Sequence, residues 1–291
     1  MIPILIVAAA ATALAALNRQ RVMRSVEAQY SALFPPDVAG IAAGARGFVL
    51  PGTNGRRLLL LHGFSDSPQS LHYLATVLNG AGYEVHVPLL PGHGRSPRAF
   101  AETTASDYHV AVSRTLEQVA DGSEWTGVIG LSMGAALATS AVSESSRVSV
   151  LVLLAPYMIP PRVVRTTGRL APLWSPFVPY LRGRGDDSIH DVAAREQSRA
   201  YGTFSRGALA ALIASADAGF QALRRIRVPV LVINSTRDNR IPRELAEQAL
   251  GVITAPLERH WLEGCGHIIT VDYCKDEVAT LVLAFLARHA G

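Results

Sequence analysis

The sequence is poor in charge and has almost no lysine. Charged residues make up 17% of the 291 residues, and Lys275 is the only lysine. The formal net charge of +4 therefore comes from arginines scattered along the chain, which form no basic block with interleaved aromatic residues. Proteins that bind nucleic acid usually carry such a block. This composition argues against a nucleic-acid partner.

Cysteine is also scarce, and internal repeats and low-complexity linkers are absent. Cys265 and Cys274 are too few for a disulfide framework or a zinc site, and they do not decide the redox compartment. Apolar residues, in contrast, are abundant, at 49% of the chain. A chain of this length can form one large domain with a full core and an insertion.

Part of the apolar excess lies at the N-terminus, where residues 2–17 are followed by Arg19, Arg21 and Arg24. This run is shorter than the roughly 20 residues that span a bilayer. The arginines follow the run, whereas a secretory signal carries its positive charge first. Three interpretations compete: a membrane anchor, an interfacial or docking helix, and a degenerate signal peptide. A helix packed on its own domain or on a partner subunit is the structural alternative.

The arginines also bear on location, because positive residues tend to stay on the cytoplasmic side of a membrane. We therefore expect a cytoplasmic or cytoplasmic-membrane-associated protein rather than a secreted one. Residues 2–17 are expected to mediate membrane association or self-association. The helical pattern continues to Tyr30 and stops at Pro35 and Pro36, since consecutive prolines cannot continue a helix.

Short apolar runs alternate with helical patterns through most of the remaining chain. The runs predict strands buried on both faces, with a weaker one at 257–262, and the patterns between them predict helices. The clearest strands are at 57–61, 83–87, 125–131, 148–154 and 228–234, and the clearest helices at 70–80, 106–120 and 276–289. This alternation predicts an α/β fold with a doubly wound, mostly parallel sheet.

The alternation stops after residue 156. Residues 157–222 hold prolines, arginines and aromatic side chains but no clear buried strand, which predicts a small helical cap insertion over the carboxyl edge of the sheet. The chain is thereby divided into an N-terminal apolar helix at 1–24, a core at 25–156 and 223–291, and a cap at 157–222. The cap residues Trp174, Phe177 and Tyr180 fit an acyl pocket and a cap core equally well.

Residues 125–138 read WTGVIGLSMGAALA, a strand, a sharp turn and a helix with one hydroxyl at the turn. A serine on such a turn adopts strained backbone geometry and projects its Oγ away from the sheet. Gly130 and Gly134 flank the turn, where side chains would collide with the neighbouring strand and helix. Ser132 is the candidate nucleophile.

A serine hydroxyl needs a base, and the base needs an orienting acid. His267 follows the last predicted strand in a glycine-containing loop, and Asp238 follows the strand at 228–234. The order serine, aspartate, histidine is the one expected for this architecture. Asp217 or Asp272 could replace Asp238 if the strand register differs.

His260 and His93 are the rivals of His267 as the base, although both fit structural roles better. A tetrahedral intermediate also needs backbone N–H donors. Met133, at the start of the helix after Ser132, offers one of them with the help of the helix dipole. Phe64, in the loop after the strand at 57–61, offers the other.

These motifs together resemble the α/β-hydrolase superfamily, and more narrowly the small bacterial carboxylesterases and monoacylglycerol lipases with a compact cap. The likeness extends from about residue 47 to the C-terminus, weakens through the cap and excludes the first 45 residues. It is carried by residues 62–64, 91–94, 130–134, Asp238 and 267–270, with Asp272, Lys275 and Asp276 close behind.

The resemblance implies Ser132 as nucleophile, Asp238 and His267 as its partners, and Phe64 and Met133 as oxyanion donors. It also implies that the protein uses no metal and no organic cofactor. The expected activity is hydrolysis of small-molecule carboxylic esters with short- to medium-chain acyl groups, or of monoacylglycerols. The alternatives are a thioesterase, a C–C hydrolase or a perhydrolase with the same triad, and a non-catalytic binding protein of this fold.

Overall fold

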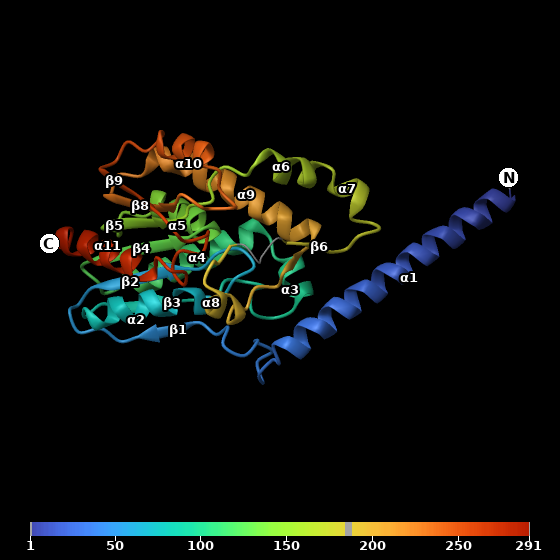
Figure 1. The fold of residues 1–291 in the computed structure, drawn as a ribbon, viewed down its shortest axis with the longest axis horizontal. Helices are drawn as coiled ribbons and strands as arrows, with labels where there is room; N and C mark the ends of the chain where they lie inside the picture. Colours follow the sequence, from blue (N-terminus) through green and yellow to red (C-terminus); the bar gives the residue numbers. More distant parts are fainter. Residues whose placement is uncertain (1, 184–187, 291) are drawn as a thin grey trace.

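The computed structural model describes residues 2–183 and 188–290. Its centre is a seven-stranded sheet in the order β1-β3-β2-β4-β5-β8-β9, in which only β1 is antiparallel to its neighbour (Figure 1). The strands are β1 (Phe48–Leu50), β2 (Arg57–Leu61), β3 (Glu84–Val87), β4 (Thr126–Leu131), β5 (Val150–Leu154), β8 (Val230–Ser235) and β9 (Leu257–Leu262). The prediction of a doubly wound, mostly parallel sheet is confirmed.

The central strands are apolar because both faces of the sheet are covered. Every residue of β4, β5 and β8 is buried, as expected for parallel strands between two helical layers. One group of helices consists of α2 (His72–Gly80) and α11 (Lys275–Arg288), which pack together. A second consists of α4 (Ala105–Ala120), α5 (Met133–Ser143) and α9 (Arg206–Ala222). The short helix α10 (Arg243–Leu250) connects β8 to β9.

The segment between β5 and β8 is more varied than the sequence predicts. It contains α6 (Arg162–Arg169), α7 (Ala171–Trp174), α8 (Val192–Glu196) and α9, together with a small antiparallel pair, β6 (Leu181–Arg182) and β7 (Thr203–Phe204). Helix α9 packs closely along α5, where a Cβ on Gly219 would lie 2.7 Å from the Cα of Ala136. The rest of the segment extends beyond the helical layers (Figure 1).

Helix α1 (Ile2–Leu33) runs from a free N-terminal half to a docked C-terminal half (Figure 1). Arg19 donates to the carbonyl of Ser175 over 3.0 Å, and Glu27 accepts from the backbone N–H of Arg98 over 2.7 Å. Tyr30 is only 5% exposed. None of the helices in the described ranges is long and apolar enough to cross a membrane.

The turn after β4 packs against the neighbouring backbone without space for side chains. A Cβ on Gly134 would lie 2.2 Å from the carbonyl oxygen of Leu61, and one on Gly130 would lie 2.4 Å from the carbonyl oxygen of Gly134. Both glycines are thus required by close approach of backbone to backbone, which the sequence pattern predicts.

We expect Gly134→Ala to lower the free energy of unfolding by about 3 kcal/mol, because the added methyl group meets backbone atoms that cannot rotate away. Gly80→Ala is the matched control. Gly80 ends α2 with nothing within 4 Å of its Cβ position, so this change should be neutral or stabilise by less than about 1 kcal/mol. Denaturant unfolding measures both, and equal stability of the two variants would contradict the packing argument.

Candidate active site

Ser132 occupies the turn between β4 and α5 in a strained conformation. Its φ is 56° and its ψ is −117°, a region that non-glycine residues avoid. The backbone N–H of Ser132 donates to the carbonyl of Leu154 over 2.9 Å, which ties the turn to the end of β5. The side chain faces a cavity that the sheet's carboxyl edge helps to form.

The structure brings Ser132, His267 and Asp238 together. His267 Nε2 lies 2.8 Å from Ser132 Oγ, and Nδ1 lies 2.7 Å from Asp238 Oδ2. An ionised carboxylate only accepts hydrogen bonds, so Nδ1 carries the proton and Nε2 is free to accept from the serine hydroxyl. The three residues follow β4, β8 and β9, whose carboxyl ends meet at one edge of the sheet.

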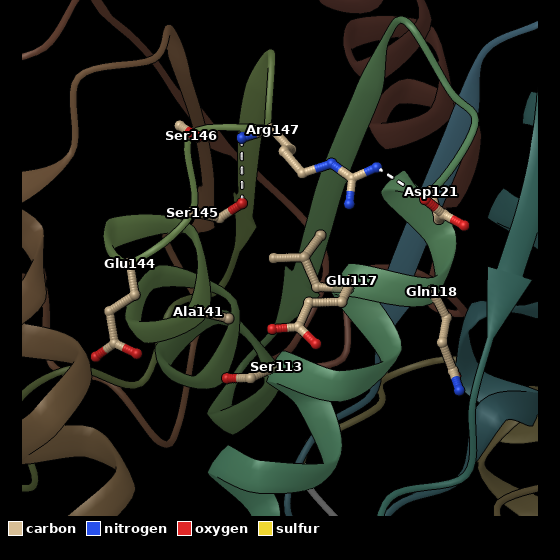
Figure 2. A pocket seen from close by; sticks show the side chains of 10 residues that line it. Ser113, Glu117, Gln118, Asp121, Ala141, Glu144, Ser145, Ser146 and Arg147 are labelled. Atoms are coloured by element: carbon tan, nitrogen blue, oxygen red, sulfur yellow. Dashed lines mark hydrogen bonds and ion pairs between the residues drawn. The ribbon is translucent and has the colours of Figure 1, made fainter.

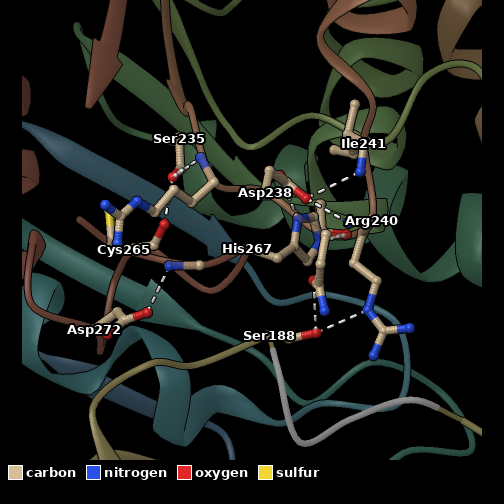
Figure 3. Close-up of polar contacts among 12 residues, drawn as sticks. Ser188, Ser235, Asp238, Arg240, Ile241, Cys265, His267 and Asp272 are labelled. Atoms are coloured by element: carbon tan, nitrogen blue, oxygen red, sulfur yellow. Dashed lines mark hydrogen bonds and ion pairs between the residues drawn. The ribbon is translucent and has the colours of Figure 1, made fainter. Parts of the chain in front are cut away.

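Asp238 is held in its ionised form. Its other oxygen, Oδ1, accepts from the backbone N–H groups of Arg240 and Ile241 at 2.7 and 2.9 Å (Figure 3). Burial alone would raise the pKa of Asp238, but the charge of His267 and these hydrogen bonds outweigh it, so the pKa lies below its usual value. The carboxylate can therefore orient the imidazole and stabilise its charged form.

The other candidate acids and one rival base have different partners. Asp217 forms a two-pronged ion pair with Arg165. His260 lies 2.8 Å from Glu258 on β9. Neither pair involves Ser132 or His267, so among the described residues Asp238 is the acid that hydrogen-bonds to the His267 imidazole.

Asp272, the third candidate acid, holds the backbone of the His267 loop. It is fully buried and accepts from the backbone N–H groups of Gly266, His190 and Asp191 at 2.7–2.8 Å. Figure 3 shows the Asp272 carboxylate beside the His267 loop. Burial raises the pKa of this carboxyl and the backbone hydrogen bonds lower it by more, so Asp272 stays charged. It joins the loop to the segment that precedes α8.

A disulfide between Cys265 and Cys274 closes the same loop, with their Cα atoms 5.7 Å apart. The sequence analysis did not predict this pair. The signal available was that the two cysteines flank the predicted base, with His267 between them, but two cysteines nine positions apart do not by themselves specify a bond.

Two buried histidines fix the loop after β2. Ser65 N–H donates to His93 Nε2 over 3.2 Å, and Leu90 N–H donates to His62 Nε2 over 3.1 Å. Their Nδ1 atoms face the carbonyl oxygens of Pro91 and of residue 63. Each ring accepts through one nitrogen, so each must be neutral. Burial lowers the pKa of His93 to about 4, which agrees with that requirement.

The backbone around Phe64 and Met133 approaches Ser132 from two sides. A Cβ on Gly63, the residue before Phe64, would lie 3.3 Å from the Cβ of Ser132. Met133 is the first residue of α5, and its N–H has no acceptor within the helix. Ser65, with a φ of 60°, is held by the backbone N–H of Tyr201, which donates to Ser65 Oγ over 3.1 Å.

The cavity beside the triad has a volume of about 740 Å³ and both apolar and polar lining residues. The apolar ones include residues of α6, β7 and α9: Val163, Val164, Phe204, Leu209 and Leu212. The polar ones include Asp66, Gln69 and Ser70 after Phe64, and Ser188, Asn239 and Arg240 from the segments before α8 and after β8. The sequence analysis missed Asp66, although it lies two residues beyond the predicted donor Phe64.

The aromatic residues predicted for an acyl pocket or cap core do not line this cavity. Trp174 donates its indole N–H to the carbonyl of Thr167 over 2.9 Å. Phe177 is 64% exposed, whereas Tyr180 is buried. Burial, with the charge of Glu27, raises the pKa of Tyr180 to about 12.

A second hollow, of about 670 Å³, lies near the opposite end of α5 from Ser132. Its walls are polar residues of α4 and of the turn after α5, among them Ser113, Glu117, Glu144 and Arg147 (Figure 2). The hollow contains no residue of the Ser132 constellation. Within residues 2–183 and 188–290, no group of His, Cys, Asp or Glu side chains is arranged to hold a metal ion.

This fold and this arrangement of serine, histidine and aspartate define an α/β hydrolase. The chain belongs to the alpha/beta hydrolase family, whose sequence profile matches residues 58–281. A thermostable monoacylglycerol lipase of Bacillus sp. (strain H-257) is 29% identical over 236 residues, which cover 80% of this chain and 91% of that protein. A carboxylesterase of Bacillus subtilis (strain 168) is 26% identical over 235 residues, covering 80% and 93%.

Solved structures give the same picture of the fold. A structure reported with the metagenome-derived lipolytic enzymes LipS and LipT has a TM-score of 0.78 at 28% identity and covers 86% of this chain and 100% of its own. The monoacylglycerol lipase of Paleococcus ferrophilus has a TM-score of 0.72 at 18% identity, covering 84% of this chain and 98% of its own. The second likeness concerns the fold alone.

Stability should fall as the pH drops from about 6.5 towards 4. The unfolded imidazole of His93 takes up a proton near pH 6.5, whereas the folded one resists until about pH 4. The unfolded state therefore binds more protons in this window, and His93 alone contributes at most about 3 kcal/mol of pH dependence. Urea unfolding at pH 7 and pH 4.5 measures this, and His93→Gln should show a smaller difference than wild type.

The control is Ser113→Ala on α4, which changes no titratable group. Its pH dependence should equal that of wild type. If His93→Gln keeps the full wild-type pH dependence, the buried imidazole is not the group that resists protonation.

Proposed function

We propose that this protein is a serine hydrolase that cleaves carboxylic esters through an acyl-enzyme on Ser132. The observation that carries the proposal is the continuous hydrogen-bonded path from Asp238 through His267 to Ser132 Oγ, with distances of 2.7 and 2.8 Å. His267 takes the serine proton during attack and returns it to the leaving alcohol. Water then cleaves the acyl-enzyme with the same base.

The backbone N–H groups of Phe64 and Met133 serve as oxyanion donors in this mechanism. Support comes from the close approach of residue 63 to Ser132 and from the position of Met133 at the start of α5. Donors fixed in the backbone need no reorganisation when charge develops on the substrate oxygen.

Short- to medium-chain acyl groups, or the acyl group of a monoacylglycerol, are the proposed acyl substrates. The apolar lining residues that α6 and α9 contribute to the cavity fit an alkyl chain. The monoacylglycerol lipase and carboxylesterase relatives support the same class of bond. Residues 157–222 act as the cap, with α9 also serving the core through its packing on α5.

We expect Ser132→Ala to lower kcat/KM for p-nitrophenyl esters by at least about 10⁴-fold, because it removes the nucleophile. The measurement is a chain-length series from acetate to palmitate, together with labelling by a serine-directed organophosphonate that the variant should lose. Ser113→Ala in the distant hollow is the matched control and should keep wild-type rates. A wild-type protein that neither hydrolyses an ester nor becomes labelled would overturn the proposal.

We further propose that the N-terminal half of α1 associates with membrane surfaces. Residues 2–17 are almost purely apolar, the arginines beyond them suit anionic headgroups, and the docking contacts of Arg19 and Glu27 lie in the second half of the helix. The arginines favour the cytoplasmic face. The Cys265–Cys274 bond, typical of oxidising compartments, is the observation against that face.

The full chain should float with vesicles that contain anionic phospholipid, and a chain starting at Ser25 should not. Catalytic rates on a soluble ester monitor the fold of the shortened chain, which keeps the Glu27 and Tyr30 contacts. Equal flotation of the two chains contradicts membrane association. A change of oligomeric state with truncation, without flotation of either chain, would identify self-association instead.

A further inference from the structure

The loop after β2 is held in place by a residue of the cap. Tyr201 lies in residues 197–202, a fully described irregular segment between α8 and β7. Its backbone N–H donates to both oxygens of Ser65, over 3.1 Å to Oγ and 3.3 Å to the carbonyl oxygen. Ser65 has a φ of 60°, which a non-glycine residue keeps only where its surroundings hold it. Tyr201 therefore fixes the residue directly after the proposed oxyanion donor Phe64.

The hydroxyl of Tyr201 binds a second loop, residues 91–95. It accepts from the backbone N–H of Arg95 over 3.1 Å and donates to the carbonyl of Gly92 over 2.9 Å. His93, whose Nε2 accepts from the Ser65 N–H over 3.2 Å, belongs to the same loop. Ser65 is thus tied to this loop twice, directly through His93 and indirectly through Tyr201.

Aromatic packing sets the position of the Tyr201 side chain. The ring stacks on Phe100 of α3 (Pro97–Glu102), with centroids 4.9 Å apart and an interplanar angle of 14°. It also packs against Tyr30 of α1, at 4.6 Å. Phe100 in turn contacts the Phe64 ring at 4.8 Å. Tyr30, Phe100 and Tyr201 form an apolar cluster apart from the main core, and Phe64 packs against both. A chain of ring contacts therefore leads from α1 to Phe64.

Helix α1 supplies one side of the space that the Tyr201 ring fills. Tyr30 is 5% exposed and Tyr201 is 8% exposed, so the two rings cover each other from water. Removal of the Tyr30 ring leaves a cavity beside Tyr201, and side chains next to a cavity shift to fill part of it. Because the Tyr201 N–H binds Ser65, such a shift releases the backbone directly after Phe64.

We propose that Tyr30 and Tyr201 are positioning residues for the oxyanion donor Phe64, so that the docked half of α1 is required for the full catalytic rate. A backbone donor stabilises the oxyanion only while it is fixed relative to the nucleophile. This inference rests on the proposed acyl-enzyme mechanism and on the proposed role of Phe64. It gives α1 a task that is independent of membrane association. A chain starting at Ser25 retains Tyr30 and therefore keeps the full rate.

The test measures kcat and KM of full-length Tyr30→Ala with p-nitrophenyl butyrate, per active site titrated to completion with an organophosphonate. We expect kcat to fall about tenfold, less than the roughly 10²–10³-fold that loss of a whole oxyanion donor costs. KM should stay unchanged, because acylation and deacylation both pass through an oxyanion and slow by the same factor. The inhibition constant of an alkyl trifluoromethyl ketone, which forms a tetrahedral adduct with Ser132, should rise by a similar factor.

Two variants serve as controls. Tyr30→Phe keeps the ring and should keep the wild-type kcat. Tyr83→Ala removes a ring that is 4% exposed and packs on Trp125 at the amino end of the sheet, away from Ser132. It should lower stability and leave kcat per site unchanged. An unchanged kcat in Tyr30→Ala, or an equal loss in Tyr83→Ala, overturns the inference. A lower kcat with an unchanged trifluoromethyl ketone constant also overturns it, because the oxyanion is then not what the ring affects.

Ser65→Ala provides a second measurement, which also holds if Tyr30→Ala does not fold. It removes the Oγ that accepts from the Tyr201 N–H, and it should lower kcat and weaken the trifluoromethyl ketone by one factor. In the double variant the loss should be smaller than the product of the two single losses, because both act through Tyr201. Multiplicative losses, or an unchanged kcat in Ser65→Ala, overturn the inference.

The two proposals fail in different ways. If wild type hydrolyses no ester and is not labelled by the organophosphonate, the proposed function fails first. If wild type hydrolyses esters and Tyr30→Ala does so at the same rate per site, only this inference fails.

Discussion

The positive φ of Ser132 is the constraint on which the rest of the site depends. L-residues avoid this conformation, so the surrounding structure must stabilise it. It does so through the hydrogen bond to Leu154 and through two glycines that let β4, β2 and α5 approach within backbone contact. The hydroxyl consequently stands above the carboxyl edge of the sheet, and both other triad residues are delivered to that edge by loops after β8 and β9.

Those loops are rigid because their buried polar groups are satisfied by backbone. One carboxylate oxygen of Asp238 accepts hydrogen bonds from backbone N–H groups of its own turn, and the other accepts from His267 Nδ1. Asp272 binds the backbone of both the His267 loop and the segment before α8, which explains why this acid is fully buried although it does not hydrogen-bond to the triad. His62 and His93 also accept hydrogen bonds from buried backbone N–H groups, and they do so as neutral side chains. The two neutral imidazoles therefore add no positive charge to the loop after β2.

The sequence predicts the sheet and the positions of Ser132, Asp238 and His267 because these features are local. Buried parallel strands read as continuous apolar runs, and the residues in question follow such runs at short distances. Between β5 and β8 the pattern of apolar runs does not predict the structure. Phe177 and Tyr180 are both aromatic, yet one is exposed and the other buried against α1, since their surroundings are set by contacts far away in the sequence. The docking of α1 through Tyr30 is equally non-local, and no local pattern in the chain predicts it.

The disulfide encloses His267 in a covalent ring. Cys265 and Cys274 close the ring around His267, and the second cysteine immediately precedes α11. The bond therefore joins the backbone two residues before His267 directly to the start of a helix that packs on α2. For the same reason, a protease that cut the chain once between the two cysteines would leave both fragments joined, with the histidine still tethered to the sheet or to the helix.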